Sequence, residues 1–332
     1  MSKALNNQVE VQGGAGVLPG VKENSLKKLF KQSGIFWVLV ALIVIGGILS
    51  PNFLKINNLI NVIRQISITG IVSIGMTFVI LTGGIDLSVG SIVGVVAVVA
   101  ATMLKMSVPI PVIILTGLVL GLILGSLNGL GITRGKIVPF IMTLGSLVAL
   151  RGLAMVIANG QPISWSRTGV AFDFLGGQSL LGIPVSVWVF AIVFVIAAIV
   201  LKYTPFGRYI YAVGDSKEAA RLSGINVKFV EFSAYAISGL LAGLCALVFI
   251  SRLSVGEPTA GTNMELDAIA MVVIGGTAST GGEGGVAGTL IGAAIIAVIA
   301  NLLNLLGISP FIQQIVKGLI IVLAVLLERR KK

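Results

Sequence analysis

Long apolar runs follow one another along almost the whole chain, separated by short polar or glycine-rich stretches. A helix needs about 20 mostly apolar residues to cross the hydrocarbon core of a bilayer. Hydrophobic residues make up 56% and charged residues 11% of the 332 positions, whereas a soluble domain carries about 25% charged residues. The 43 glycines suit closely packed membrane helices. The chain is therefore predicted to be an all-α, polytopic membrane helical bundle.

The apolar runs predict about ten transmembrane segments. Their expected ranges are 35–49, 66–81, 92–104, 112–130, 138–157, 184–201, 229–250, 266–274, 286–306 and 311–327. The third and eighth are short, which makes them candidates for broken or re-entrant helices. Segment 53–63 mixes asparagines with apolar residues and is expected to form a separate interfacial helix. Segment 159–183 is expected to be a long polar loop.

Basic residues gather at one side of this topology, which gives the domain organisation. We expect a cytoplasmic tail over 1–34, a membrane domain over 35–328 and a basic cytoplasmic end over 329–332. The net charge of +11 then follows from the positive-inside rule, and lipid rather than nucleic acid is the expected surroundings. Both termini are predicted to lie in the cytoplasm.

Several kinds of chemistry are excluded by what the chain lacks. There is no histidine and only one cysteine, Cys245, so histidine metal sites and an internal disulfide are impossible. The phosphate-binding pattern GxxxxGK[ST] does not occur, and the run 131–136 has the wrong spacing for it. An intramembrane enzyme is therefore disfavoured. We expect no cofactor and no metal in this chain.

The longest charged connection between two apolar runs is 202–228, KYTPFGRYIYAVGDSKEAARLSGINVK. Pro205 and Gly207 are expected to end the preceding span. Asp215 or Ser216 can cap a short helix that carries Glu218 in its first turn. Ala219, Ala220 and Arg221 suit its interior, and Gly224 can end it in a left-handed conformation. The alternative is a solvated loop that only sets the topology.

Two glycine-rich breaks interrupt apolar runs, at 82–91 and at 275–285. Such breaks mark the transport pathway in repeat-built transporters, and they also connect tightly packed helices. Ionisable residues at membrane depth line cavities or pair, and the alternative is that they lie at interfaces and cap helices, as Asp86 and Ser88 can for the third span. The candidate residues for a translocation path or gate are Asp86, Asn128, Glu265, Asp267, Thr277, Ser279, Thr280, Glu283 and Asn301.

Four runs carry a resemblance to a known family. Glu218-Ala219-Ala220 followed by Gly224 resembles the EAA…G signature of ABC importer permeases. The runs GMTFVILTGGIDLSVGS (75–91), FGRYIYAVGDSKEAARLSGINV (206–227) and PTAGTNMELDAIAMVVIGGTASTGGEGG (258–285) resemble the sugar-specific permeases of the ribose type. The run 305–325 does as well, and the similarity covers about residues 35 to 330. Permeases for xylose, allose, galactose and autoinducer-2 share these motifs.

The resemblance implies a vitamin-B12-type (type II) importer fold in a bacterial inner membrane, assembled as a homodimer. It also implies a cytoplasmic ATPase that binds ATP and Mg, and an extracytoplasmic sugar-binding protein. The residues that it assigns to ATPase coupling are Asp215, Glu218, Ala219, Ala220, Arg221 and Gly224. The expected cargo is ribose or a similar monosaccharide. The alternative is a secondary transporter driven by an ion gradient, with Asp86 or Asp267 as its ion site.

Overall fold

The computed structural model describes residues 25–165 and 171–329, and most of this part is helical. The bundle is built from helices α1 (Ser25–Leu49), α2 (Ile56–Leu81), α3 (Val89–Lys105), α4 (Ile110–Thr133), α5 (Pro139–Ile157), α6 (Val185–Tyr203), α7 (Pro205–Asp215), α8 (Lys217–Leu222), α9 (Val227–Leu253), α10 (Met264–Ile274), α11 (Val286–Leu305) and α12 (Pro310–Arg329). Most of the predicted tail and all but the first residue of the basic C-terminal end lie outside the described residues.

Within the described residues, six helices are long and apolar enough to cross a membrane: α2, α4, α5, α6, α9 and α11. Shorter apolar helical stretches lie at 34–49, 89–105 and 310–323. These lengths confirm the prediction of an all-α, polytopic membrane protein.

Short strands occur only beside the loops at one end of the described bundle. Strand β1 (Ile163–Ser164) pairs antiparallel with β4 (Val255–Gly256), and β2 (Ser179–Leu180) pairs antiparallel with β3 (Ile183–Pro184). A 3-10 turn, η1 (Ala171–Phe174), lies between β1 and β2. The predicted polar loop 159–183 is therefore folded over its described residues. Ser251 at the end of α9 holds it, because its hydroxyl donates to the Phe172 carbonyl oxygen at 2.6 Å.

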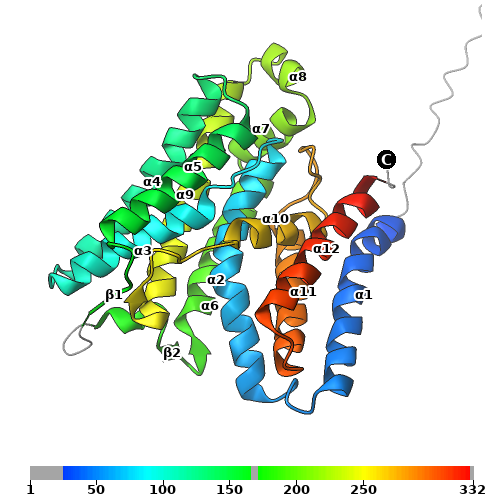
Figure 1. Cartoon of the computed structure of the whole chain (residues 1–332). Coiled ribbons are helices and arrows are strands. Elements are labelled where there is room, and N and C mark those ends of the chain that lie inside the picture. The colour runs from blue at the N-terminus through cyan, green and yellow to red at the C-terminus, as the bar shows by residue number, and fades with distance from the viewer. Residues whose placement is uncertain (1–24, 166–170, 330–332) are drawn as a thin grey trace, which may run out of the picture.

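Helices α2 and α9 form the centre of the bundle, and α4 packs on α9 through glycine. A Cβ on Gly125 of α4 would lie 2.8 Å from the Cα of Gly239, and one on Gly121 would lie 2.9 Å from the Cα of Gly243. Backbones approach this closely only where side chains are absent. Figure 1 shows α2 between two groups of helices, with α3, α4, α5 and α9 on one side and α1, α11 and α12 on the other.

One prediction about a segment boundary is wrong. Segment 53–63 is not a separate interfacial helix, because α2 begins at Ile56 and runs without a break to Leu81. Its polar residue Asn58 faces α11, where its amide exchanges two hydrogen bonds with that of Asn301, at 2.9 and 2.8 Å. Helix α1 begins at Ser25 and so includes the last residues of the segment 1–34, whose assignment as a cytoplasmic tail stays a prediction.

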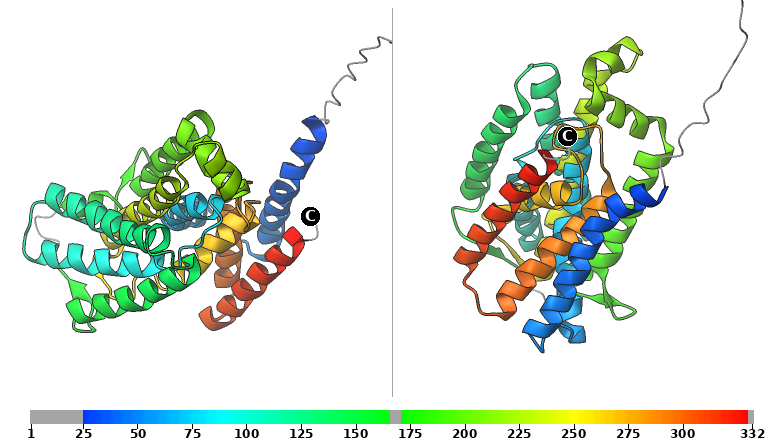
Figure 2. Two further views of the ribbon diagram at one scale, coloured as in Figure 1. Left: turned by 90° about the horizontal axis from the view of Figure 1, so that it is seen from above. Right: turned by 90° about the vertical axis from the view of Figure 1, so that its right-hand side faces the viewer.

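Connection 202–228 contains two helices rather than one. Pro205 does not only end α6 but also begins α7, since proline suits the first turn of a helix. The hydroxyl oxygen of Thr204 caps this turn by accepting from the Gly207 amide at 3.1 Å. Helices α7 and α8 project from one end of the bundle, as Figure 1 and the side view in Figure 2 show.

Candidate functional site

Helix α8 has the caps that the sequence predicts. Ser216, rather than Asp215, is its N-cap, and its hydroxyl oxygen accepts from the Ala219 amide at 3.2 Å. Gly224 follows the helix with φ +81°. The amides of Gly224 and Ile225 donate to the carbonyl oxygens of Arg221 and Ala220, both at 3.0 Å, which is a Schellman ending. Both ends of this short helix are therefore fixed by local hydrogen bonds.

The exposed surface of α8 is charged, and contacts with the bundle fix the orientation of the helix. Ala220 is buried against the bundle, whereas Glu218 and Arg221 are exposed and pair at 2.7 Å. The Glu218 carboxylate raises the pKa of the Arg221 guanidinium above its ordinary value through this hydrogen bond. Lys217 bonds to Glu231 of α9 at 2.6 Å. The helix thus presents a defined, charged face away from the membrane-spanning part.

Three segments far apart in sequence meet at the end of α7 that precedes α8. The amide of Gly282 donates to the carbonyl oxygen of Leu81, the last residue of α2, at 3.0 Å. A Cβ on Gly214 of α7 would lie 1.9 Å from this carbonyl oxygen and 2.4 Å from the Gly282 nitrogen. We call this contact the glycine junction. It joins α7, the end of α2 and the glycine break (residues 275–285) through backbone atoms alone.

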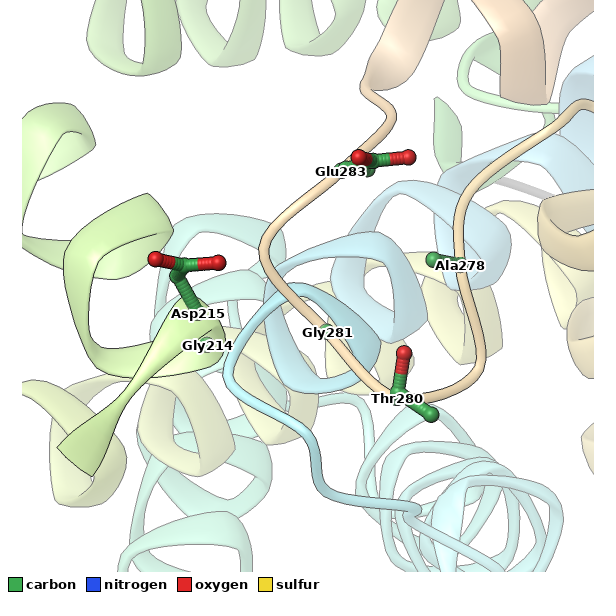
Figure 3. Close-up of a pocket in the computed structure, with 6 residues that line it drawn as sticks. All are labelled: Gly214, Asp215, Ala278, Thr280, Gly281 and Glu283. Atoms are coloured by element: carbon green, nitrogen blue, oxygen red, sulfur yellow. The ribbon is translucent and has the colours of Figure 1, made fainter. Parts of the chain in front are cut away.

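A pocket of about 240 Å³ opens beside the glycine junction. It is lined by Gly214, Asp215, Ala278, Thr280, Gly281 and Glu283 (Figure 3). The carboxylate-bearing residues come from the end of α7 and from the glycine break. The hydroxyl of Tyr211 on α7 also donates to the Gly284 carbonyl oxygen at 3.0 Å. The glycine break is therefore fastened to α7 at several points.

Within the glycine break, the predicted gate residues differ in exposure. Helix α10 ends at Ile274, as predicted, and five glycines of the break have positive φ. Thr277 is buried, and its hydroxyl oxygen accepts from the Gly285 amide at 3.3 Å. Ser279, Thr280 and Glu283 are exposed. Whether this break acts as a gate or as a connector stays a prediction.

Asp86 is the centre of a buried polar network. One carboxylate oxygen accepts from the Ser88 amide at 3.0 Å and from the Ser88 hydroxyl at 2.6 Å, and the other accepts from Ser238 of α9 at 2.9 Å. Asn128 of α4 donates to Ser88 at 2.7 Å and accepts from Ser146 of α5. The network links α3, α4, α5 and α9 at the first glycine-rich break.

Of the two residues expected to cap the third span, Asp86 is not the cap. Its side chain is 0% exposed, and Ser88 takes the N-cap position of α3 without a side-chain cap hydrogen bond. Asn128, another predicted path residue, joins the network of Asp86 through Ser88. Ser146 and Ser238 were not identified from the sequence as members of this network. Single serines in apolar helices carry no sequence signal of their own, because only the long-range packing reveals their partners.

Glu265 lies at the start of α10, beside a segment without helix. This unwound segment, residues 257–263, crosses α3 at Gly90 and Gly94, where Cβ atoms would lie within 2.2 Å and 3.1 Å of its carbonyl oxygens. Arg151 of α5 holds it, because one guanidinium nitrogen donates to the carbonyl oxygens of Pro258 and Ala260 at 2.7 and 2.8 Å. The Oε2 atom of Glu265 is buried and has no hydrogen-bond partner among the described residues.

The two remaining predicted path residues lie in pairs. Asp267 of α10 pairs with Lys317 of α12 at 2.9 Å, and both side chains are partly exposed. Asn301 of α11 pairs with Asn58, near the start of α2. The structure therefore does not gather the predicted path residues into one site. It divides them among the polar network, the α10 helix start, the glycine break and the α11 helix.

Comparison with known proteins decides the family. Residues 58–325 match the family described as the permease component of branched-chain amino acid transport systems. The chain belongs to this permease family. The match covers all of the motifs named above, including α8, the glycine break and the polar network. No solved structure matches this permease.

The curated relatives of the permease include sugar transporters. It is 46% identical over 306 residues to the ribose import permease protein of Escherichia coli strain K12, which covers 92% of this chain and 95% of the relative. Identity to the ribose import permease protein of Haemophilus influenzae is also 46%, over 88% of this chain and 91% of the relative. The xylose transport system permease protein of Escherichia coli is 36% identical, over 84% and 86%. The resemblance to ribose-type permeases is confirmed.

Proposed function

We propose that this chain is the membrane-spanning permease subunit of an ATP-driven, binding-protein-dependent importer of ribose or a similar monosaccharide. The identity to ribose import permeases along nearly the full length supports the cargo. The observation that carries the mechanism is α8, a short helix with both ends capped and a charged exposed face. The end of α7, which precedes α8, is joined to the end of α2 and to the glycine break after α10 through the glycine junction.

The proposal includes partners and a membrane arrangement. A second copy of the chain, a cytoplasmic ATPase that binds ATP and Mg, and an extracytoplasmic sugar-binding protein complete the transporter. The chain itself crosses a bacterial inner membrane about ten times in a type II arrangement, with the shorter helices α3 and α10 completed by their breaks. Both termini face the cytoplasm, on the side of α8, as the positive-inside rule requires.

Transport follows from the way α8 is held. When the ATPase dimer closes on ATP, its groove moves α8 as a rigid unit. Because the glycine junction has no side chains to deform, this movement passes directly to the end of α2 and to the glycine break after α10. The two glycine-rich breaks then shift together, and the passage changes between its outward and inward openings.

The alternative of an ion-driven transporter has less support. All three hydrogen bonds to the Asp86 carboxylate come from the protein, and Asp267 is neutralised by Lys317. The Asp86 carboxylate is buried and so does not offer the accessible oxygens that a transported Na⁺ would need, because hard cations take several oxygen ligands. The Asp267 carboxylate is partly exposed, but the Lys317 ammonium balances its charge. Helix α8 has no use in such a transporter.

Uptake of a panel of labelled sugars tests the proposal. Cells deleted for the chain should take up the cognate monosaccharide only when the gene is restored, and uptake should depend on ATP rather than on the membrane potential. The chain purified alone should hydrolyse no ATP, and it should co-purify with an ATPase. Uptake that persists after ATP depletion and stops with an uncoupler would support the ion-driven alternative instead.

A further inference from the structure

Arg151 is placed where a charged side chain is costly. It is the thirteenth of the 19 residues of α5, a helix that is long and apolar enough to span the membrane. A charge at such a depth is found almost only where it faces protein or a water-filled cavity. Arg151 is only partly buried in the single chain. Its accessible part must therefore face something other than lipid.

The guanidinium is fixed from its inner side. One nitrogen donates to two carbonyl oxygens of the unwound segment, Pro258 and Ala260. A Cβ on Gly94 of α3 would lie 2.8 Å from the same nitrogen, so a side chain here would displace the guanidinium from this contact. A guanidinium presents five N–H donors in a rigid plane. With one nitrogen held, the plane is oriented, and further donors stay available because no other hydrogen bond involves Arg151 among the described residues.

A buried acidic side chain lies near the guanidinium. Glu265 is only 9% exposed and acts on Arg151 electrostatically, although no direct ion pair between them occurs in the described structure. The unpartnered Oε2 atom is a rare feature in a native interior, and such atoms call for an explanation. A carboxylate that balances Arg151 without occupying its donors leaves those donors free for another acceptor.

The side of α5 that carries Arg151 borders two segments of irregular backbone. Thr143, Leu147 and Arg151 follow at intervals of four residues and so lie on one side of the helix. The buried Thr143 hydroxyl donates at 3.3 Å to the carbonyl oxygen of Ile85, in the first glycine-rich break, and Arg151 holds the unwound segment. Leu147 lies between them and is partly exposed. Irregular backbone at membrane depth is buried in protein or lines a water-filled cavity, so this side of α5 suits a passage.

We propose that Arg151 contacts the sugar in the passage, donating hydrogen bonds from its free guanidinium N–H groups to hydroxyl oxygens of the monosaccharide. This inference rests on the proposed function and adds a residue that selects for hydroxyl groups. A planar donor fork suits two neighbouring hydroxyl oxygens of a neutral sugar. Glu265 is a positioning residue, which holds the guanidinium in place by its charge. The side chain of Leu147, one turn away on the same side of α5, borders the same contact.

The test compares a pentose with its deoxy analogue in the assembled transporter. The variants Arg151→Lys, Arg151→Gln and Arg151→Met are measured for uptake of both sugars, because a site that hydrogen-bonds a hydroxyl discriminates against the analogue that lacks it. The preference for the pentose should fall severalfold in Arg151→Met and less in Arg151→Lys. The control Arg252→Gln removes a guanidinium at the end of α9 and should leave the preference unchanged.

A second measurement holds even if a variant of Arg151 assembles poorly. Leu147→Cys in a Cys245→Ser background is labelled with a small thiol reagent in the assembled transporter. The pentose should slow the labelling, and the deoxy analogue should slow it less. An unchanged sugar preference in Arg151→Met at normal membrane levels would overturn the inference, as would equal loss for both sugars or labelling that neither sugar affects. If the unaltered transporter takes up no sugar at all, the proposed function fails instead.

Discussion

The amide of Gly282 donates to the carbonyl oxygen of Leu81 at 3.0 Å, although the two residues are far apart in the sequence. Leu81 ends α2, and Gly282 belongs to the break that follows α10. Gly214 at the end of α7 closes on both of them without room for a side chain. The segment that bears the proposed ATPase-binding helix is thus in backbone contact with the end of α2 and with the glycine break after α10.

A methyl group at Gly214 should disturb this junction. In Gly214→Ala the new Cβ would lie 1.9 Å from the Leu81 carbonyl oxygen, so the backbones must separate. We expect a loss of about 1–3 kcal/mol in stability, as for other overpacked sites, and a larger loss of uptake than of ATP hydrolysis. Uptake and ATPase activity are measured on the same vesicles. Gly318→Ala on α12 is the control, since nothing lies within 4 Å of its Cβ; equal behaviour of the two variants would contradict the transmission role.

Charge reversal on α8 should uncouple transport. Glu218→Lys breaks the pair with Arg221 and places a positive charge in the first turn, against the helix dipole. Because α8 is exposed, the fold should persist, and uptake should fall by about tenfold or more as the partner contact weakens. Uptake and co-purification with the ATPase are compared with those of Lys55→Glu, which lies outside α8. Normal uptake by an intact complex would count against the docking helix.

Substitution at Gly224, which ends α8, should also reduce transport. Gly224 has φ +81° with nothing near its Cβ position, so Gly224→Val is opposed by backbone strain rather than by a clash. We expect a strain of about 1–2 kcal/mol, fraying of α8 and reduced uptake. Gly224→Asn, which tolerates the left-handed region, is the matched control and should retain most of the uptake. Circular dichroism is too coarse for one short helix, so limited proteolysis at 217–224 reports the fraying.

The pair between Asp267 and Lys317 should support α10 against α12. Asp267→Asn leaves the Lys317 ammonium without its counter-charge in a partly buried position. Removing one partner of a buried pair costs about 3–5 kcal/mol, and partial exposure here reduces this to about 1–3 kcal/mol. The melting temperature in detergent should fall. The exchanged pair Asp267→Lys with Lys317→Asp should recover part of the loss; no recovery would indicate that the two charges act separately.

Single cysteines in the glycine break distinguish a gate from a connector. Cys245 is buried and is first replaced by serine. Cysteines at Ser279, Thr280 and Glu283, which are exposed, should react with an impermeant thiol reagent from the cytoplasmic side. A cysteine at the buried Thr277 should react only when ATP and the sugar-binding protein are supplied. Uniform labelling in every state, with uptake unaffected by bulky adducts, would reduce the break to a connector.

Reporter fusions test the orientation of the chain. A reporter active only in the cytoplasm should function after Lys332 and should fail when it is inserted after Gln161, an exposed position beyond α5. The opposite-specificity reporter, active only outside the cytoplasm, gives the matched control at the same two sites. The reverse pattern would overturn the proposed arrangement of about ten crossings.

Apolar patterning predicts the membrane helices well, because lipid enforces helix wherever the chain is apolar. The expected span 286–306 corresponds to α11 (Val286–Leu305), and 266–274 to α10 (Met264–Ile274). Errors arise where polar residues belong to a spanning helix. Asn58 made the first turns of α2 appear interfacial, although its partner Asn301 lies on α11.

Helix α8 is predictable because its caps are local in sequence. Ser216 and Gly224 act within a few residues of themselves. Helix α7 was missed because a proline can either end one helix or begin the next. Only the structure shows that Pro205 begins α7. The glycine junction and the polar network need contacts between distant segments, which spacing along one chain cannot supply.

The glycine junction consists of amide and carbonyl groups and carries no net charge. Dissolved ions screen exposed charges over a Debye length of about 8 Å at physiological salt, but they do not weaken packed neutral backbone in the same way. Raising the ionic strength should therefore weaken the binding of a partner to α8. The backbone contact between α7, α2 and the glycine break should not change. High salt in the cell would then reduce the number of assembled transporters. The transport rate of each transporter that remains assembled would stay the same.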